Sequence, residues 1–106
     1  MNILDKIVAQ KRIEVAAAKA GKKQPEFEKD PLFSRPGLSL AAALRSTPTP
    51  GIIAEFKRQS PSKGIINDQV KPEDVTAGYT AAGAKCLSVL TDTPFFGGTF
   101  EDFAKA

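Results

Sequence analysis

Hydrophobic positions near the start of the chain recur at helical spacing. The apolar residues between positions 3 and 18 fall on one stripe of a helix, which only Lys11 interrupts. Asn2 can cap this helix, and Gly21 suits the position after its last turn. The pattern predicts a helix over about 2–20, with a stripe that needs another part of the protein to cover it. The stripe consists of Ile3, Leu4, Ile7, Val8, Lys11, Val15 and Ala18.

The following stretch is punctuated by prolines. Residues 22–37 contain three prolines and a lysine pair, which predict an irregular connection with little regular structure. Ser39 then precedes a run of leucines and alanines that predicts a short helix, ended by Thr47 and Pro48. Residues 1–50 are therefore expected to form a helical N-terminal extension.

Beyond residue 50, apolar runs alternate with helical signals. Residues 51–57 and 86–91 each predict a buried strand. Between them lies a long loop over 58–71, and then a helix over about 72–82 that should pack through Val75 and Tyr79. A strand, helix, strand order implies a parallel pair of strands, so the fold class is α/β.

The end of the chain resembles the start of another helix. Thr99 and Asp102 have the spacing of a capping pair, with few residues after them. Two parallel strands do not make a stable sheet by themselves, because parallel sheets have several strands and are covered on both faces. Residues 51–106 are therefore expected to be the opening of a larger α/β protein, truncated inside its second βα unit.

Glu55 and Lys57 are the sharpest chemical feature of the sequence. Because strand side chains alternate, both should project from the same face near the carboxyl end of the first strand. Ligands bind at the carboxyl ends of strands in parallel α/β folds, and a Lys–Glu pair can perform acid–base chemistry there. The alternative is an ion pair with a structural role, or a solvated pair on an edge strand. The residues alone leave both interpretations open.

Two loops follow the predicted strands and could complete a site. Residues 60–64, Ser-Pro-Ser-Lys-Gly, offer hydroxyls and an ammonium group to an anion, although Ser-Pro also simply starts turns. Residues 95–98, Phe-Phe-Gly-Gly, could wall an aromatic pocket, and core packing is the alternative. Cys86 is expected to be a small buried hydrophobic residue rather than a nucleophile.

Composition narrows the functional classes. The 106 residues include no histidine and one cysteine, which excludes His-dependent catalytic triads, His-ligated zinc and an internal disulfide within this chain. The net charge of +3 is spread among both signs, so it gives little support to a nucleic-acid binder. No apolar run approaches the roughly 20 residues that span a bilayer. We expect a cytoplasmic protein with no nucleic-acid or membrane partner.

Several motifs together resemble one family. Residues 53–64 read Ile-Ala-Glu-Phe-Lys-Arg-Gln-Ser-Pro-Ser-Lys-Gly, and residues 82–84, 87–92 and 95–98 follow with Ala-Gly-Ala, Leu-Ser-Val-Leu-Thr-Asp and Phe-Phe-Gly-Gly. With the opening Ile-Leu-Asp-Lys-Ile at residues 3–7, these segments resemble the indole-3-glycerol phosphate synthases of tryptophan biosynthesis. The resemblance covers essentially the whole chain.

This resemblance implies a (βα)₈ TIM-barrel lyase preceded by extra helices. The family converts 1-(2-carboxyphenylamino)-1-deoxyribulose 5-phosphate, a phosphorylated sugar joined to anthranilate, to indole-3-glycerol phosphate with loss of carbon dioxide and water. It uses no cofactor and no metal. By motif match, Glu55 and Lys57 are catalytic, and Lys57, Ser60 and Phe96 bind substrate. Ser60 is expected to hold the anthranilate carboxylate, and Phe96 to line the aromatic pocket.

The chain differs from the family in its length. A barrel of this type needs about 250 residues, so the chain is expected to hold only strands 1 and 2 with the N-terminal extension. The family's general acid, general base and phosphate-binding groups on later strands would be missing. We therefore expect the chain to be inactive alone. The alternative is a non-catalytic barrel fragment that self-associates through its exposed strand edges.

Overall fold

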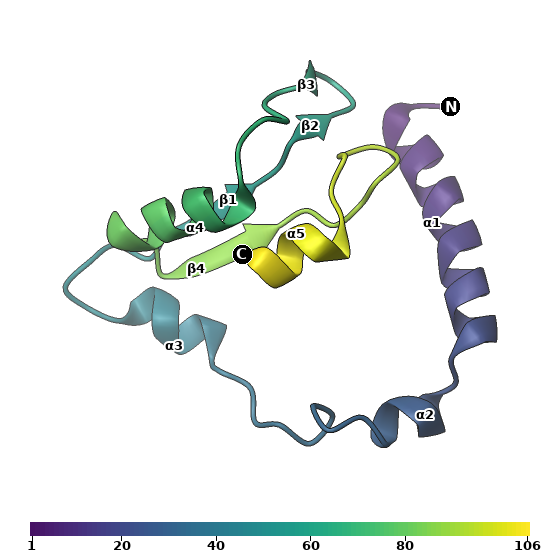
Figure 1. Cartoon of the computed structure of the whole chain (residues 1–106), viewed down its shortest axis with the longest axis horizontal. Helices are drawn as coiled ribbons and strands as arrows, with labels where there is room; N and C mark the ends of the chain where they lie inside the picture. Colours follow the sequence, from purple (N-terminus) through teal and green to yellow (C-terminus); the bar gives the residue numbers. More distant parts are fainter. The chain divides into compact units, whose positions relative to one another are not determined.

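The computed structural model describes all 106 residues, which form two compact units, residues 1–38 and residues 39–106 (Figure 1). The helices are α1 (Ile3–Gly21), α2 (Gln24–Glu28), α3 (Leu40–Arg45), α4 (Pro72–Ala81) and α5 (Phe100–Lys105), and the strands are β1 (Ile53–Phe56), β2 (Gln59–Ser60), β3 (Gly64–Ile65) and β4 (Cys86–Val89).

The first unit is dominated by α1, whose bounds confirm the predicted N-terminal helix. Asn2 and Asp5 close its start reciprocally: Asn2 Oδ1 accepts a hydrogen bond from Asp5 N at 2.8 Å, and Asp5 Oδ2 accepts one from Asn2 N at 3.3 Å. No residue of α1 is buried. The helix is thus specified by its local signals, while its apolar stripe is exposed except at half-buried Ile7 and Lys11.

The predicted irregular connection over residues 22–37 is wrong in its first part, because α2 lies there. Pro25 occupies the first turn of α2, where its fixed φ favours a helix and its missing N–H costs nothing. Glu26 Oε1 accepts a hydrogen bond from Lys23 N at 3.2 Å, which satisfies one of the free donors at the helix start. The proline therefore begins an element here rather than breaking one.

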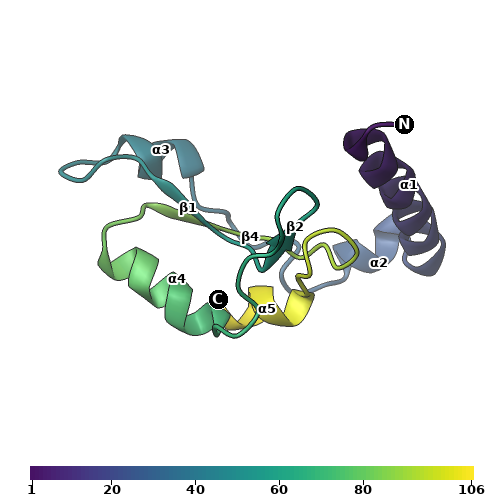
Figure 2. The same ribbon diagram turned by 90° about the horizontal axis from the view of Figure 1, so that it is seen from above.

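The second unit is built on a parallel pair of strands. β1 pairs with β4 in the register Ile53 to Cys86 and Phe56 to Val89, and the connection between them contains α4. This confirms the predicted strand, helix, strand crossover, with both strands slightly shorter than expected. Figure 2 shows α4 and α5 on one side of these strands and α3 on the other. The sheet has only two strands, so no barrel is closed in this structure.

The core of the second unit is small. Phe56 is its one buried hydrophobic side chain, with 4% of its surface exposed. Thr76 of α4 is 2% exposed, and its Oγ1 donates a hydrogen bond to the carbonyl of Pro72 at 2.9 Å. Val75 and Tyr79, which we expected to carry the packing of α4, are only half-buried. A threonine whose hydroxyl bonds to its own helix backbone can be buried with its polar group satisfied, and the periodicity of apolar residues does not detect it.

α3 belongs to the same compact unit as the sheet and contacts β4. Its start confirms the predicted cap, because Ser39 Oγ accepts a hydrogen bond from Ala42 N at 3.1 Å. None of the helices, α1 included, has the length and apolar character needed to cross a membrane.

Candidate active site

Glu55 and Lys57 lie together at the carboxyl end of β1. Lys57 Nζ is 3.9 Å from Glu55 Oε1, which confirms that the two side chains project to the same side. On β4, Ser88 is the residue paired with Glu55, and Ser88 Oγ donates a hydrogen bond to Glu55 Oε2 at 2.9 Å. The parallel register therefore holds one oxygen of this carboxylate and leaves the other to Lys57.

The Glu55–Lys57 ion pair is loose and accessible. At 3.9 Å it is longer than a direct charged hydrogen bond, and the Lys57 and Glu55 side chains are 39% and 47% exposed. An exposed pair at this distance contributes little to stability. Its ammonium group can therefore turn to an incoming anion at small cost.

Ser60 is more enclosed than its predicted role suggests. It is 8% exposed and lies in β2, which pairs with β3 to form a small antiparallel hairpin inside the predicted loop over 58–71. Ser60 Oγ accepts a hydrogen bond from Lys63 N at 3.2 Å and lies 3.4 Å from Ser62 Oγ. The hydroxyl hydrogen can still be donated, because a serine oxygen accepts and donates at once.

Phe96 is half-buried in the turn that follows β4. The carboxylate of Asp92 holds this turn, since its Oδ2 accepts hydrogen bonds from Phe95 N at 2.9 Å and Phe96 N at 3.2 Å. Thr93 Oγ1 donates to the carbonyl of Gly98 at 2.7 Å and closes the same turn. The position of the Phe96 backbone is thus fixed by side chains that immediately follow the strand.

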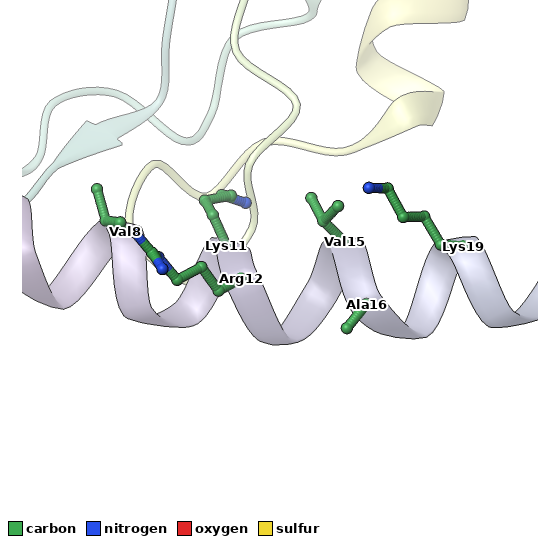
Figure 3. A pocket seen from close by; sticks show the side chains of 6 residues that line it. All are labelled: Val8, Lys11, Arg12, Val15, Ala16 and Lys19. Atoms are coloured by element: carbon green, nitrogen blue, oxygen red, sulfur yellow. The ribbon is translucent and has the colours of Figure 1, made fainter.

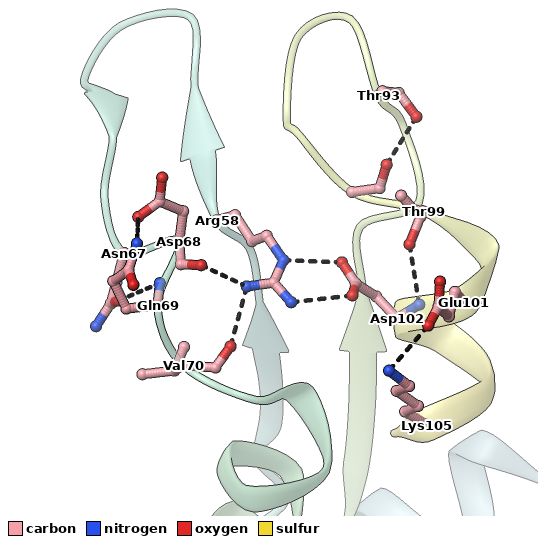
Figure 4. Close-up of polar contacts among 11 residues, drawn as sticks. Arg58, Asn67, Asp68, Gln69, Val70, Thr93, Thr99, Glu101, Asp102 and Lys105 are labelled. Atoms are coloured by element: carbon pink, nitrogen blue, oxygen red, sulfur yellow. Dashed lines mark hydrogen bonds and ion pairs between the residues drawn. The ribbon is translucent and has the colours of Figure 1, made fainter.

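Arg58 and Asp102 form the strongest polar contact of the unit (Figure 4). Arg58 Nε and Nη2 lie 2.9 and 3.0 Å from the two carboxylate oxygens of Asp102, and the two side chains are only 18% and 11% exposed. These hydrogen bonds lower the pKa of Asp102 below its usual 3.8 and raise the pKa of Arg58, against the opposing effect of burial. From the sequence, Asp102 is predicted only as a helix-capping residue, and no local pattern singles out Arg58.

A groove of about 330 Å³ runs beside the Glu55–Lys57 pair. Its wall includes Tyr79, whose hydroxyl donates to the backbone carbonyl of Glu55 at 3.3 Å. The groove therefore places open space next to the two charged residues, between β1 and the segment that leads into α4. The residues lining it are Glu55, Phe56, Lys57, Ile66, Asn67, Val70, Val75 and Tyr79.

A second hollow, of about 410 Å³, belongs to the other unit (Figure 3). All the side chains that line it come from α1, and they combine an apolar strip with basic groups. None of the predicted site residues is among them. The lining residues are Val8, Lys11, Arg12, Val15, Ala16 and Lys19.

Comparison with known protein families gives a match over almost the whole chain. The family model for indole-3-glycerol phosphate synthase matches residues 4–106. The chain belongs to the indole-3-glycerol phosphate synthase family. Members of this family have the TIM-barrel fold, to which the parallel β1–β4 pair with its α4 crossover conforms.

Curated indole-3-glycerol phosphate synthases are similar along the whole chain. The protein from Bacteroides thetaiotaomicron is 43% identical over 105 residues, which is 99% of this chain and 40% of the relative. The protein from Azoarcus sp. is 45% identical over 103 residues, covering 94% and 39%, and that from Acaryochloris marina is 43% identical over 101 residues, covering 94% and 33%. The chain thus spans about 40% of the length of the synthases it matches.

The synthase motif residues fall into two groups in the structure. Glu55 and Lys57 are in contact, with Ser88 as a further partner that the sequence analysis missed. Ser88 could have been found, because it occupies the matching face of the second predicted strand. Ser60 and Phe96 instead lie on the two loops that follow β1 and β4. No group of three or more His, Cys, Asp or Glu side chains is arranged to hold a metal ion.

Proposed function

We propose that this chain is the N-terminal part of an indole-3-glycerol phosphate synthase and supplies the Glu55–Lys57 pair to its active site. The observation that carries the proposal is the contact of these two side chains at the carboxyl end of β1, in a chain that matches the family over residues 4–106. In this proposal residues 51–106 are the first two βα units of the barrel, and residues 1–50 are the helical extension. A cytoplasmic location without nucleic-acid or membrane partners belongs to the same proposal.

The proposed substrate is 1-(2-carboxyphenylamino)-1-deoxyribulose 5-phosphate. Closing the indole ring requires activation of the sugar carbonyl by an acid, loss of carbon dioxide, and then loss of water with further proton transfers. Lys57 binds an anionic group of the substrate and donates a proton in the dehydration. Glu55, held by Ser88, orients Lys57 and exchanges protons with it or with the substrate.

Ser60 and Phe96 are proposed to bind the anthranilate part of the substrate. The Ser60 oxygen accepts from Lys63 N, which leaves its hydrogen for the anthranilate carboxylate. Phe96 offers a flat apolar surface to the aromatic ring. No cofactor or metal is assigned to the reaction, since each step is a proton transfer or the making or breaking of a bond within the substrate.

A chimaera tests the proposal. The chain replaces the matched 105 residues of the Bacteroides thetaiotaomicron relative, and formation of indole-3-glycerol phosphate is followed by indole fluorescence. We expect turnover by the chimaera and none by the 106-residue chain alone, because removing a single positioned acid or base costs roughly 10²–10⁴-fold. Turnover by the chain alone would show that the barrel's other strands are not needed.

Lys57→Ala in the chimaera should remove activity, whereas Lys71→Ala should not. Lys71 is an exposed lysine at the start of α4 and serves as the matched control for loss of one positive charge. Equal activity in the two variants would contradict the role assigned to Lys57. An inactive but folded parent chimaera would contradict the proposed function itself.

A second candidate function rests on the open edges of the sheet. β1 and β4 pair only with each other, so each has one edge whose backbone groups have no strand beside them. We propose that the 106-residue chain self-associates through these edges when it is separated from the rest of a barrel. Light scattering at micromolar concentration should give a mass above that of the 11.3 kDa monomer. A monomer with a sharp unfolding transition would exclude this candidate.

A further inference from the structure

We infer that Arg58 and Asp102 are a positioning pair that holds the loop after β1 against the loop after β4, and so fixes where Ser60 and Phe96 lie relative to each other. The inference rests on the proposed function, because it assigns these two residues to the substrate site of that reaction. Neither residue is expected to touch substrate. Their role is to hold the residues that do.

Arg58 connects three segments of the unit. Besides the two bonds to Asp102 of α5, its Nη1 donates to the carbonyl of Val70 at 3.0 Å and lies 3.4 Å from the carbonyl of Asp68 (Figure 4). The backbone carbonyl of Arg58 accepts from Ile66 N at 2.8 Å. One residue therefore ties the end of β1, the return arm of the β2–β3 hairpin and the first turn of α5.

The two loops touch directly where the site residues begin. Gly97 has φ +65°, and a β-carbon built on it would lie 2.9 Å from Gln59 Cδ. Within the loop after β4 itself, a β-carbon on Gly98 would lie 1.9 Å from the carbonyl oxygen of Leu90, so this loop is closely folded on its own start. Gln59 precedes Ser60, and Gly97 follows Phe96, so the approach of Gly97 to the Gln59 side chain is one residue away from both predicted substrate-binding residues. The two loops are therefore in contact beside the residues that we assign to substrate.

The carboxylate of Asp102 is directed at Arg58 rather than at its own helix. Thr99 Oγ1 accepts from Asp102 N at 3.0 Å and caps α5. In a capping box the acidic side chain three residues later would return to the cap backbone, whereas here both of its oxygens bind Arg58, 44 positions away. Arg58 also lies over the ring of buried Phe56, 5.2 Å from its centre. The pair thus joins the loops to the best-packed side chain of β1.

The experiment compares Asp102→Asn with Glu101→Gln. Both changes neutralise one carboxylate of α5, but Glu101 pairs only with exposed Lys105, at 2.9 Å, and its side chain is 74% exposed. Amide NMR spectra of the folded chimaera report loop positions. In Asp102→Asn, the signals of residues 59–64 and 95–98 should shift or broaden while those of β1 and β4 stay in place. In Glu101→Gln, both sets should remain unchanged.

Kinetics in the chimaera separate positioning from simple loss of stability. Misplacing a binding group by about 1 Å can cost on the order of 10²-fold, and Ser60 and Phe96 are assigned to binding. Asp102→Asn should therefore raise KM at least about 10-fold and leave kcat close to that of the parent. A variant that merely unfolds part of the sample would lower kcat and leave KM unchanged. Arg58→Lys should give the same rise in KM, because lysine keeps the charge but cannot form the two-pronged bond.

Every result of these measurements supports or overturns the positioning role of Arg58 and Asp102. Loop signals that stay in place in Asp102→Asn, or a loss confined to kcat, would overturn the positioning role. If Asp102→Asn does not fold, Arg58→Lys provides the same two measurements. If the folded parent chimaera has no activity, the proposed function fails, and the NMR comparison still decides whether the pair holds the two loops.

Discussion

Side-chain hydrogen bonds in residues 1–38 join near neighbours, as in the Asn2–Asp5 and Gln10–Glu14 pairs, which span three and four positions. In residues 39–106 they also join residues 24 to 44 positions apart, from Tyr79–Glu55 to Arg58–Asp102. The first unit contains no buried residue, whereas the buried residues of the second include Phe56, Ser60, Thr76 and Asp102. One unit is therefore a set of locally encoded helices, and the other depends on a few long-range contacts.

This difference predicts which unit loses more stability when a single residue is substituted. A locally encoded helix responds to its own caps and composition, and a single substitution alters it by small amounts. A unit with one buried aromatic ring and one enclosed ion pair loses much of its stability when either is removed. The proposed active site lies in the sensitive unit.

The substitution expected to distinguish the two units most clearly is Phe56→Ala. Removing a buried phenylalanine costs about 3–5 kcal/mol, which is comparable with the whole stability of a domain this small. We expect the β1 and β4 amide signals to collapse to unfolded positions while those of α1 persist. Phe103→Ala is the control, because Phe103 is 64% exposed in the same unit and its loss should change the free energy of unfolding by less than about 0.5 kcal/mol. Simultaneous loss of α1 would show that the units are not independent.

Acid should weaken the second unit through Asp102. Its pKa is lowered below 3.8 in the folded protein by Arg58, so the pair stabilises fully above the unfolded pKa and loses this contribution as pH falls through the folded pKa. We expect Asp102→Asn to lower the free energy of unfolding by about 2 kcal/mol near neutral pH. Denaturant unfolding at a series of pH values should show this gap closing below about pH 3.8. A gap that stays constant to the lowest pH would mean that the carboxylate charge is not what matters.

The smallest expected effect lies in the first unit. Asn2→Ala removes the cap of α1 and should cost about 1 kcal/mol of helix stability, seen as faster hydrogen exchange in its first turn. Asn2→Ser should restore protection, because a serine oxygen can accept the same bond from Asp5 N. The exchange rates of β1 and β4 should not change. An effect of Asn2→Ala on those strands would remove the distinction between the two units.

Elements with local signals could be predicted, and long-range contacts could not. The bounds of α1 follow from Asn2 and from helical spacing, and the Glu55–Lys57 contact follows from alternation within one strand. The Arg58–Asp102 pair could not be found this way, because it depends on how α5 packs near the end of β1. The burial of Thr76 and Ser60 could not be predicted either, because their side chains are polar and a pattern of apolar residues does not include them. α2 was missed because a proline was interpreted as a breaker and not as a first-turn residue.

The parallel register of β1 and β4 has a consequence for synthesis of the chain on the ribosome. Glu55 and its partner Ser88 are 33 residues apart, so at ordinary elongation rates β1 emerges about 2–7 s before the strand it pairs with. During that interval an apolar strand is available to other nascent chains. Glu55 and Lys57 place two neighbouring charges on one face of the strand and its carboxyl end, which disfavours incorrect pairing in the way that charged gatekeeper residues do. The two residues assigned to catalysis would thus protect the strand before any substrate is bound.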